Sequence, residues 1–231
     1  MFVVKRKNLV ILSVLAVTFF TFILCFFSLG KTVDMGVDKI KVVLDAGHGG
    51  IDGGVSGVNT LVKESELNLI VTKKLQNYLQ NAGIEVVLTR STQSGLYGLA
   101  TKNLKRKDMQ KRKEIILKAK PTLVVSVHMN KYASSSRRGG QVFYSGENEQ
   151  AKILAQSVQS SFNELYSDIK EYSPLKGEYY ILNCTPYPTI IAECGFLSSP
   201  IDESLLITEE HQSAVAYSIF KGIVEYLSKI S

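Results

Sequence analysis

Three side chains that could take part in catalysis lie at or just beyond the ends of predicted strands. His48 lies in the glycine-rich stretch LDAGHGGIDGG, after a predicted strand at 39–45. His128 ends the strand TLVVSVH, and Glu193 lies near the end of the strand TIIAECG. Catalytic zinc usually takes three His and carboxylate ligands, with water in the fourth position. If the fold brings these residues together, the sequence predicts metal-assisted hydrolysis.

Such a hydrolase needs a further carboxylate beyond its metal ligands. Zinc can lower the pKa of water to about 7, and a nearby carboxylate can then pass the water proton to a leaving amine. Glu64 and Glu66, at the start of a predicted helix, are both candidates for the third ligand. Spacing alone does not separate them, and either could instead interact with the helix dipole.

The glycines around His48 let the loop bend sharply and leave space for an ion and a substrate. They do not form a nucleotide-binding loop. No GxxxxGK[ST] motif is present, and Asp52 stands where the third glycine of a GxGxxG motif would fall.

Strands and helices alternate along the chain from residue 39, as β-branched runs and helical apolar spacing indicate. The predicted strands are 39–45, 84–90, 122–128, 139–145 and 189–195, and the predicted helices are 64–83, 108–120, 147–166 and a short and a long helix within 203–228. This order predicts an α/β fold with a twisted, mainly parallel sheet flanked by helices on both faces. In such sheets ligands bind outside the carboxyl ends of the strands, so His48, His128 and Glu193 should meet at one edge.

The first 30 residues predict export of the domain that follows. Lys5, Arg6 and Lys7 precede an uncharged apolar segment at 9–30. About 20 apolar residues can span a bilayer, and the basic cluster should stay in the cytoplasm. A membrane anchor is the favoured interpretation, and a cleaved signal peptide, which has a shorter apolar core, is the alternative. Residues 31–38 then form a linker, and 39–231 form a single catalytic domain.

The charge balance excludes one class of partner. Without the first 30 residues the chain has 24 Lys and Arg against 21 Asp and Glu, a net charge of +3. This mildly basic balance suits an anionic surface such as a bacterial wall and does not indicate nucleic acid. The densest basic run, 102–114, is interpreted as a solvated helix face. Cys184 and Cys194 could pair or remain thiols.

Several ordered motifs resemble the zinc-dependent N-acetylmuramoyl-L-alanine amidases of the Amidase_3 family. LDAGHGGIDGGVSG resembles the family's D-x-GHGG-x-D-x-G segment, VKESELNL its E-K-x-x-x-L segment, and VVLTR its V-x-L-T-R strand. DMQKRKEIILKAKPTLVVSVHMN and PTIIAECGFLSSPIDESLL resemble the segments that follow. The resemblance spans about 39–228. It implies that His48, Glu64 and His128 bind Zn²⁺ and that Glu193 is the catalytic glutamate.

The stretch EYYILNCTPYPTIIAECGFLS and the lack of wall-binding repeats resemble the spore-cortex germination branch, the CwlD type. This implies hydrolysis of the bond between N-acetylmuramic acid and L-alanine, in spore-cortex maturation with muramic-δ-lactam formation and in germination. The partners would be peptidoglycan glycan strands and stem peptides, the membrane through 9–30 if uncleaved, and, as a candidate, an activator protein. The expected location is the outer face of the cytoplasmic membrane, the cell wall or the forespore intermembrane space. Departures from the family pattern include Ser65 in place of Lys and Pro200 in place of Asn, and none falls on a site residue.

Three alternatives remain. The chain could be a general vegetative wall amidase, a thiol hydrolase using Cys194 with His128 or His48, or a non-enzymatic wall-binding module. His211 is expected on a helix surface without a role. Asn130 is a candidate substrate contact, with a role in a turn as the alternative.

Overall fold

The computed structural model describes residues 17–19, 21 and 39–230, and the residues from Lys39 onward form one compact unit. The predicted linker 31–38 and nearly all of the predicted anchor or signal segment 1–30 lie outside the described residues. Both therefore stay predictions. Among the described residues, no helix has the length and apolar character needed to cross a membrane.

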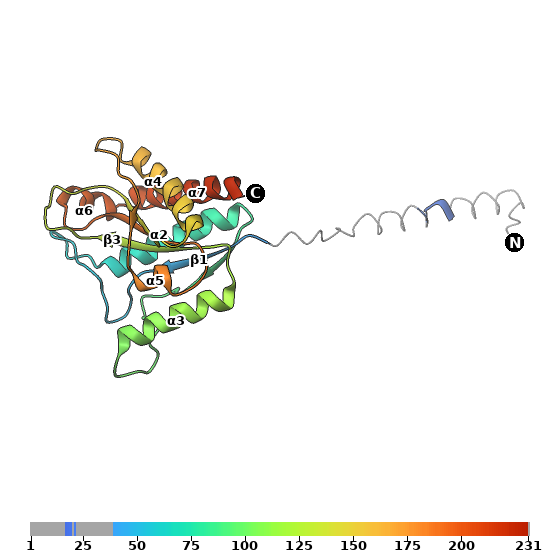
Figure 1. Cartoon of the computed structure of the whole chain (residues 1–231), viewed down its shortest axis with the longest axis horizontal. Helices are drawn as coiled ribbons and strands as arrows, with labels where there is room; N and C mark the ends of the chain where they lie inside the picture. Colours follow the sequence, from blue (N-terminus) through green and yellow to red (C-terminus); the bar gives the residue numbers. More distant parts are fainter. Residues whose placement is uncertain (1–16, 20, 22–38, 231) are drawn as a thin grey trace, which may run out of the picture. The chain divides into compact units, whose positions relative to one another are not determined.

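A mainly parallel sheet of six strands forms the centre of this unit, as predicted (Figure 1). The strands are β1 (Lys41–Ala46), β2 (Glu85–Leu88), β3 (Leu123–Asn130), β4 (Gln141–Tyr144), β5 (Leu175–Lys176) and β6 (Thr189–Phe196), in the order β2-β1-β3-β6-β4-β5. β1, β2, β3 and β6 run parallel to one another, whereas β4 is antiparallel to β6 and parallel to β5. The sequence analysis did not predict β5, which has only two residues.

Helices cover both faces of the sheet, which confirms the predicted layers (Figure 1). They are α2 (Glu64–Asn81), α3 (Leu104–Ala119), α4 (Glu149–Leu165), α5 (Tyr180–Asn183), α6 (Pro200–Leu206) and α7 (Glu209–Ile230). α2, α4 and α7 pack on one face, and α3 and α5 on the other. α3 begins at Leu104 rather than at the predicted residue 108, and α5 was not predicted.

Successive side chains of a strand point to opposite faces of the sheet, so a separate hydrophobic core forms on each face. Val42 and Leu44 of β1 point into the larger core, and Val43 points into the smaller one. This follows from the two-residue period of a strand. Leu67, Val71 and Leu75 of α2 recur every four residues and pack into the larger core.

The strand register brings the predicted site to one edge of the sheet. Asp45 of β1 pairs with Ser126 of β3, and His128 of β3 pairs with Glu193 of β6. The glycine-rich loop leaves β1 at the same edge, because parallel strands share the position of their carboxyl ends.

Candidate active site

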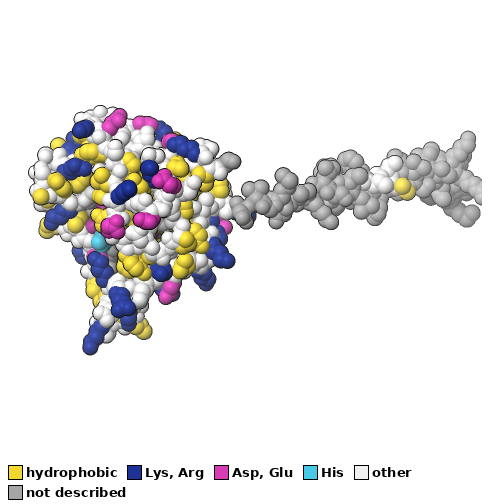
Figure 2. Space-filling model, in the orientation of Figure 1, with side chains coloured by type: hydrophobic (Ala, Val, Ile, Leu, Met, Phe, Trp, Pro, Cys, Tyr) yellow, Lys and Arg dark blue, Asp and Glu magenta, His cyan; other side chains and the backbone are white. Residues whose placement is uncertain are grey.

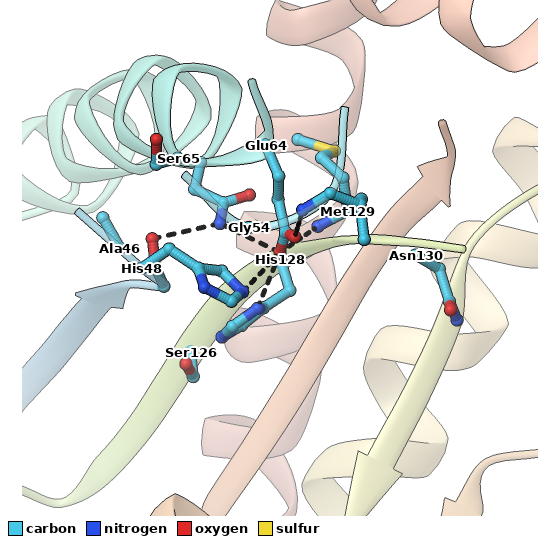
Figure 3. A network of polar contacts seen from close by, with 12 residues as sticks. Ala46, His48, Gly54, Glu64, Ser65, Ser126, His128, Met129 and Asn130 are labelled. Atoms are coloured by element: carbon cyan, nitrogen blue, oxygen red, sulfur yellow. Dashed lines mark hydrogen bonds and ion pairs between the residues drawn. The ribbon is translucent and has the colours of Figure 1, made fainter. Parts of the chain in front are cut away.

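His48, Glu64 and His128 form a cluster that could hold a metal ion. Nε2 of His48 lies 3.2 Å from Oε1 of Glu64, and Nδ1 of His128 lies 2.9 Å from the same oxygen. One ligand atom from each residue lies within 4.8 Å of the other two. Figure 3 shows the Glu64 carboxylate meeting both imidazole rings, which come from the loop after β1 and from β3. Glu66, the other candidate from the sequence, is exposed and is not part of this cluster.

Two glycines allow these ligand side chains to approach the loop. A Cβ atom on Gly47 would lie 2.2 Å from the imidazole of His128, and one on Gly54 would lie 2.3 Å from Oε2 of Glu64. Any larger residue at these two positions would therefore displace a side chain of the cluster. This is the close backbone approach that only glycine permits.

Further polar groups contact two members of the cluster, His48 and Glu64. Oδ1 of Asp52 lies 2.9 Å from Nδ1 of His48, which leaves Nε2 directed at Glu64. Glu64 accepts hydrogen bonds from the backbone N–H of Val55 at 2.9 Å and from Asn68 at 3.3 Å. Metal-binding histidines and carboxylates commonly have such outer partners, which fix the tautomer and the ring orientation. The sequence analysis assigned no role to Asp52 or Asn68.

The electrostatics keep the Glu64 carboxylate charged. Burial raises the pKa of Glu64, but hydrogen bonds from His128 and His48, together with their charges, hold it well below its usual range. An anionic oxygen between two imidazoles is a donor set that suits Zn²⁺. The residues present therefore fit the implied metal.

Glu193 lies beside the cluster and has a free oxygen. It pairs with His128 across the β3–β6 ladder, and its Oε2 is buried without a hydrogen-bond partner within residues 39–230. Burial raises the pKa of Glu193 to about 7; the charge of His128 opposes this shift, and the charge of Glu64 adds to it. A carboxyl group with a pKa near neutrality can both accept and donate a proton under ordinary conditions.

Two buried arginines hold the backbone of the histidine loop. Arg112 donates to the carbonyl of His48 at 2.6 Å, and Arg90 donates to the carbonyl of Gly47 at 2.8 Å. His48 itself has a φ of 60°, in a region that costs energy for a residue with a side chain. Such strain persists only where surrounding contacts over-determine the conformation, and these arginines supply them.

Arg112 corrects the interpretation of the basic run. Its side chain is 1% exposed and forms ion pairs with Asp45 at 2.6 Å and Asp108 at 2.5 Å. Burial raises the pKa of Asp45, but Arg112 and the Ser126 hydroxyl help to lower it to about 2. The solvated-face interpretation is therefore wrong for Arg112. It describes the exposed neighbours, such as Arg106.

We expect Arg112→Met to lower the free energy of unfolding by about 3–5 kcal/mol, because it leaves two buried carboxylates without their cation. Arg106→Met is the matched control on the same helix and should change it by at most about 0.5 kcal/mol. Urea unfolding of both variants measures the difference. Equal stability of the two variants would contradict the buried ion-pair network.

The cluster opens into a pocket of about 680 Å³. Tyr97, Leu104 and Met109 line it on the α3 side, and Tyr179 and Tyr180 line it from the α5 segment. The sequence analysis did not place these tyrosines in the site, because no secondary structure was predicted around them, between 91 and 107 or between 167 and 188. Tyrosine is amphipathic, so the residue type alone gave no sign of a pocket wall.

The remaining candidates lie outside the cluster. Among the described residues Cys184 and Cys194 form no disulfide, and Cys194 is fully buried, where burial raises its pKa well above the usual value. This geometry does not suit a thiol nucleophile. His211 is half-buried and its Nε2 lies 2.9 Å from the Tyr166 hydroxyl, so it is not the free surface residue expected. Asn130 lines the pocket.

Comparisons with known proteins identify similar families and relatives. Residues 42–225 match the family Amidase_3, described as N-acetylmuramoyl-L-alanine amidase. The chain is 33% identical over 192 residues to the germination-specific N-acetylmuramoyl-L-alanine amidase of Bacillus subtilis, with 81% of this chain and 80% of that protein covered.

Two solved structures resemble the fold. One is the CwlD amidase of Clostridioides difficile, solved in complex with the GerS lipoprotein. It matches with a TM-score of 0.79 and 32% identity over 83% of this chain and 100% of that chain. The other is the catalytic domain of the amidase CwlV from Bacillus (Paenibacillus) polymyxa var. colistinus. It matches with a TM-score of 0.71 and 29% identity over 82% and 98%, respectively.

Proposed function

Since the chain belongs to the Amidase_3 family and is an N-acetylmuramoyl-L-alanine amidase acting on peptidoglycan, we propose that its activity depends on zinc. His48, Glu64 and His128 would hold the ion, and Glu193 would move the proton. The observation that carries this proposal is the meeting of three ligand atoms within 4.8 Å, beside a buried, unpartnered carboxylate oxygen.

The bond cut is the amide between the lactyl group of N-acetylmuramic acid and L-alanine. When bound, zinc supplies Lewis acidity, which polarises the carbonyl and acidifies water. The Glu193 carboxylate accepts the proton from the attacking water and then donates it to the leaving amide nitrogen. Its raised pKa suits both steps, because a carboxylate with its usual pKa would be a weaker base. Asp52 holds the His48 ring in place while this happens.

Mass spectrometry of muropeptides tests this activity. Zinc-loaded protein incubated with purified muropeptides should release a free lactyl carboxyl on the sugar and a peptide with a free L-alanine amine. The control is the same protein after dialysis against a chelator, which should release neither product. Cleavage at another bond, or undiminished cleavage after zinc removal, would reject the zinc amidase proposal.

The finer proposal is a role in spore-cortex maturation and germination. It is supported by the similarity to a germination-specific amidase of Bacillus subtilis and to the CwlD amidase of Clostridioides difficile. In that role, amide removal exposes the lactyl carboxyl, which a second enzyme can close into muramic-δ-lactam. General vegetative wall cleavage is the second candidate, supported by similarity to probable cell wall amidases of staphylococci.

We expect deletion of the gene to leave vegetative growth intact, while spores lose muramic-δ-lactam and germinate poorly. The physical reason is that the lactam ring requires the carboxyl group that this hydrolysis exposes. Lactam content of purified cortex, measured by chromatography of digested muropeptides, is the readout. Normal lactam in the deletion strain would remove the spore assignment and leave the amidase activity in place.

The substrate and these relatives also support export to the outer face of the cytoplasmic membrane, the cell wall or the forespore intermembrane space. Fractionation of cells that make a tagged chain would test this, since recovery in the cytoplasm would oppose it. An activator protein is a proposed partner, because the similar CwlD amidase was solved in complex with the GerS lipoprotein. Full activity of the purified protein alone would argue against a required activator.

A further inference from the structure

The charges that line the pocket are almost all matched within the protein. Among the pocket carboxylates, Asp45 and Asp108 contact Arg112, and Asp52 contacts His48. Glu64 contacts both histidines of the cluster. Glu193 is left for proton transfer. Each carboxylate of the pocket therefore belongs to the metal cluster, contacts a residue that holds the cluster in place, or is proposed for proton transfer.

Two cationic side chains that line the pocket form no ion pair within the described residues. Lys105 of α3 and Lys131, just after β3, both line it and are both exposed. In the part of the chain that the structure describes, neither forms an ion pair, whereas Lys41 and Lys111 each pair with a glutamate. Dark blue Lys and Arg side chains also gather at the lower tip in Figure 2, where Figure 1 places the start of α3.

Lys105 shares its pocket with the metal cluster. The same pocket is lined by His48 and by Asp52, the residue that touches His48. The Lys105 ammonium therefore faces the cavity in which the scissile amide must sit.

The rest of the wall is poor in charge. Tyr97, Leu104 and Met109 on one side and Tyr179 and Tyr180 on the other offer apolar and phenolic surface. A pocket of about 680 Å³ can hold several residues of a peptide. Consecutive residues are about 3.3–3.6 Å apart when extended, so a group one residue beyond the scissile amide stays within the pocket.

We propose that Lys105 and Lys131 form a subsite for a carboxylate of the stem peptide, one residue beyond the L-alanine that the enzyme releases. This inference rests on the proposed function. In peptidoglycan that position holds a D-glutamate joined through its side chain, and its α-carboxylate is free unless the cell converts it to an amide. The subsite makes the enzyme selective for stem peptides in which this α-carboxylate is free.

Two muropeptides of equal length test the proposal, one with D-glutamate and one with D-isoglutamine after L-alanine. We expect the zinc-loaded wild type to cleave the acidic form with a kcat/KM about 5- to 20-fold higher, as two partly exposed ion pairs permit. In the Lys105→Met/Lys131→Met double variant this ratio should fall to about 1. Lys118→Met, an exposed lysine of α3 outside the pocket, should keep the wild-type ratio.

Salt offers an independent measurement. Raising the ionic strength to about 1 M shortens the Debye length to about 3 Å and should shrink the wild-type ratio. Equal kcat/KM of the wild type on both muropeptides, or an unchanged ratio in the double variant, would overturn the subsite. A wild type that cleaves neither muropeptide would instead count against the proposed function.

Discussion

Glu193→Ala should keep its zinc and its fold and yet hydrolyse muropeptides about 100- to 10,000-fold more slowly than the wild type. A positioned acid and base contributes a factor of this size to the rate. Glu193 is next to the cluster but is not one of the three residues whose ligand atoms meet. Its Oε2 is buried and has no hydrogen-bond partner among the residues that the structure describes. Removing it should therefore take away proton transfer and leave the donors of the ion intact.

The measurements are kcat on a purified muropeptide and zinc content by elemental analysis. Glu193→Gln is the matched variant, because it keeps the shape of the side chain and removes its ability to take a proton. Both variants should fall to similar rates. Activity close to that of the wild type in either variant, with zinc retained, would reject the proton-transfer role of Glu193.

His128→Ala should lose both zinc and activity. The wild type should bind about one zinc per chain, as three protein donors and an open fourth position are typical of catalytic sites. In the variant, Nδ1 of His128, which lies 2.9 Å from Glu64, is gone, and only two of the three donors remain. We expect zinc content after dialysis to fall close to zero, and the rate to fall at least as far as in Glu193→Ala.

His211→Ala is the matched control, because His211 is the remaining histidine of the chain and contacts Tyr166 rather than the cluster. It should retain about one zinc per chain. Elemental analysis of the two variants, prepared side by side, gives the comparison. Equal zinc in His128→Ala and the wild type would exclude the proposed ligand set.

The local sequence patterns were sufficient to predict the main strands and helices and their arrangement in layers. Continuous β-branched runs such as TLVVSVH and helical spacing such as Leu67, Val71 and Leu75 predicted the main strands and helices, because burial on a sheet or helix requires that periodicity. Their alternation predicted the layers and the shared edge. The ordered motifs indicated the family and, with it, His48, Glu64, His128 and Glu193.

Some helices and strands could not be predicted, because their sequences show little or no periodic pattern of apolar residues. β5 has two residues and α5 has four, so neither offers enough length for a period to show. The buried residues of α3 are Asp108, Arg112 and Ile116. A helix whose buried positions include charged residues has the sequence pattern of a surface helix. The early start of α3 at Leu104 was missed for the same reason.

The sequence by itself determined the fold class, the family and the identity of the four residues proposed for the chemistry. The tertiary structure separates the two carboxylates that residue spacing alone left open, since it places Glu64 in the cluster and leaves Glu66 exposed. It also decided that Arg112 holds the His48 loop from 64 residues away. The physical reason is that a buried charge acquires its function from partners distant in the chain, and such pairings leave no periodic pattern in the sequence.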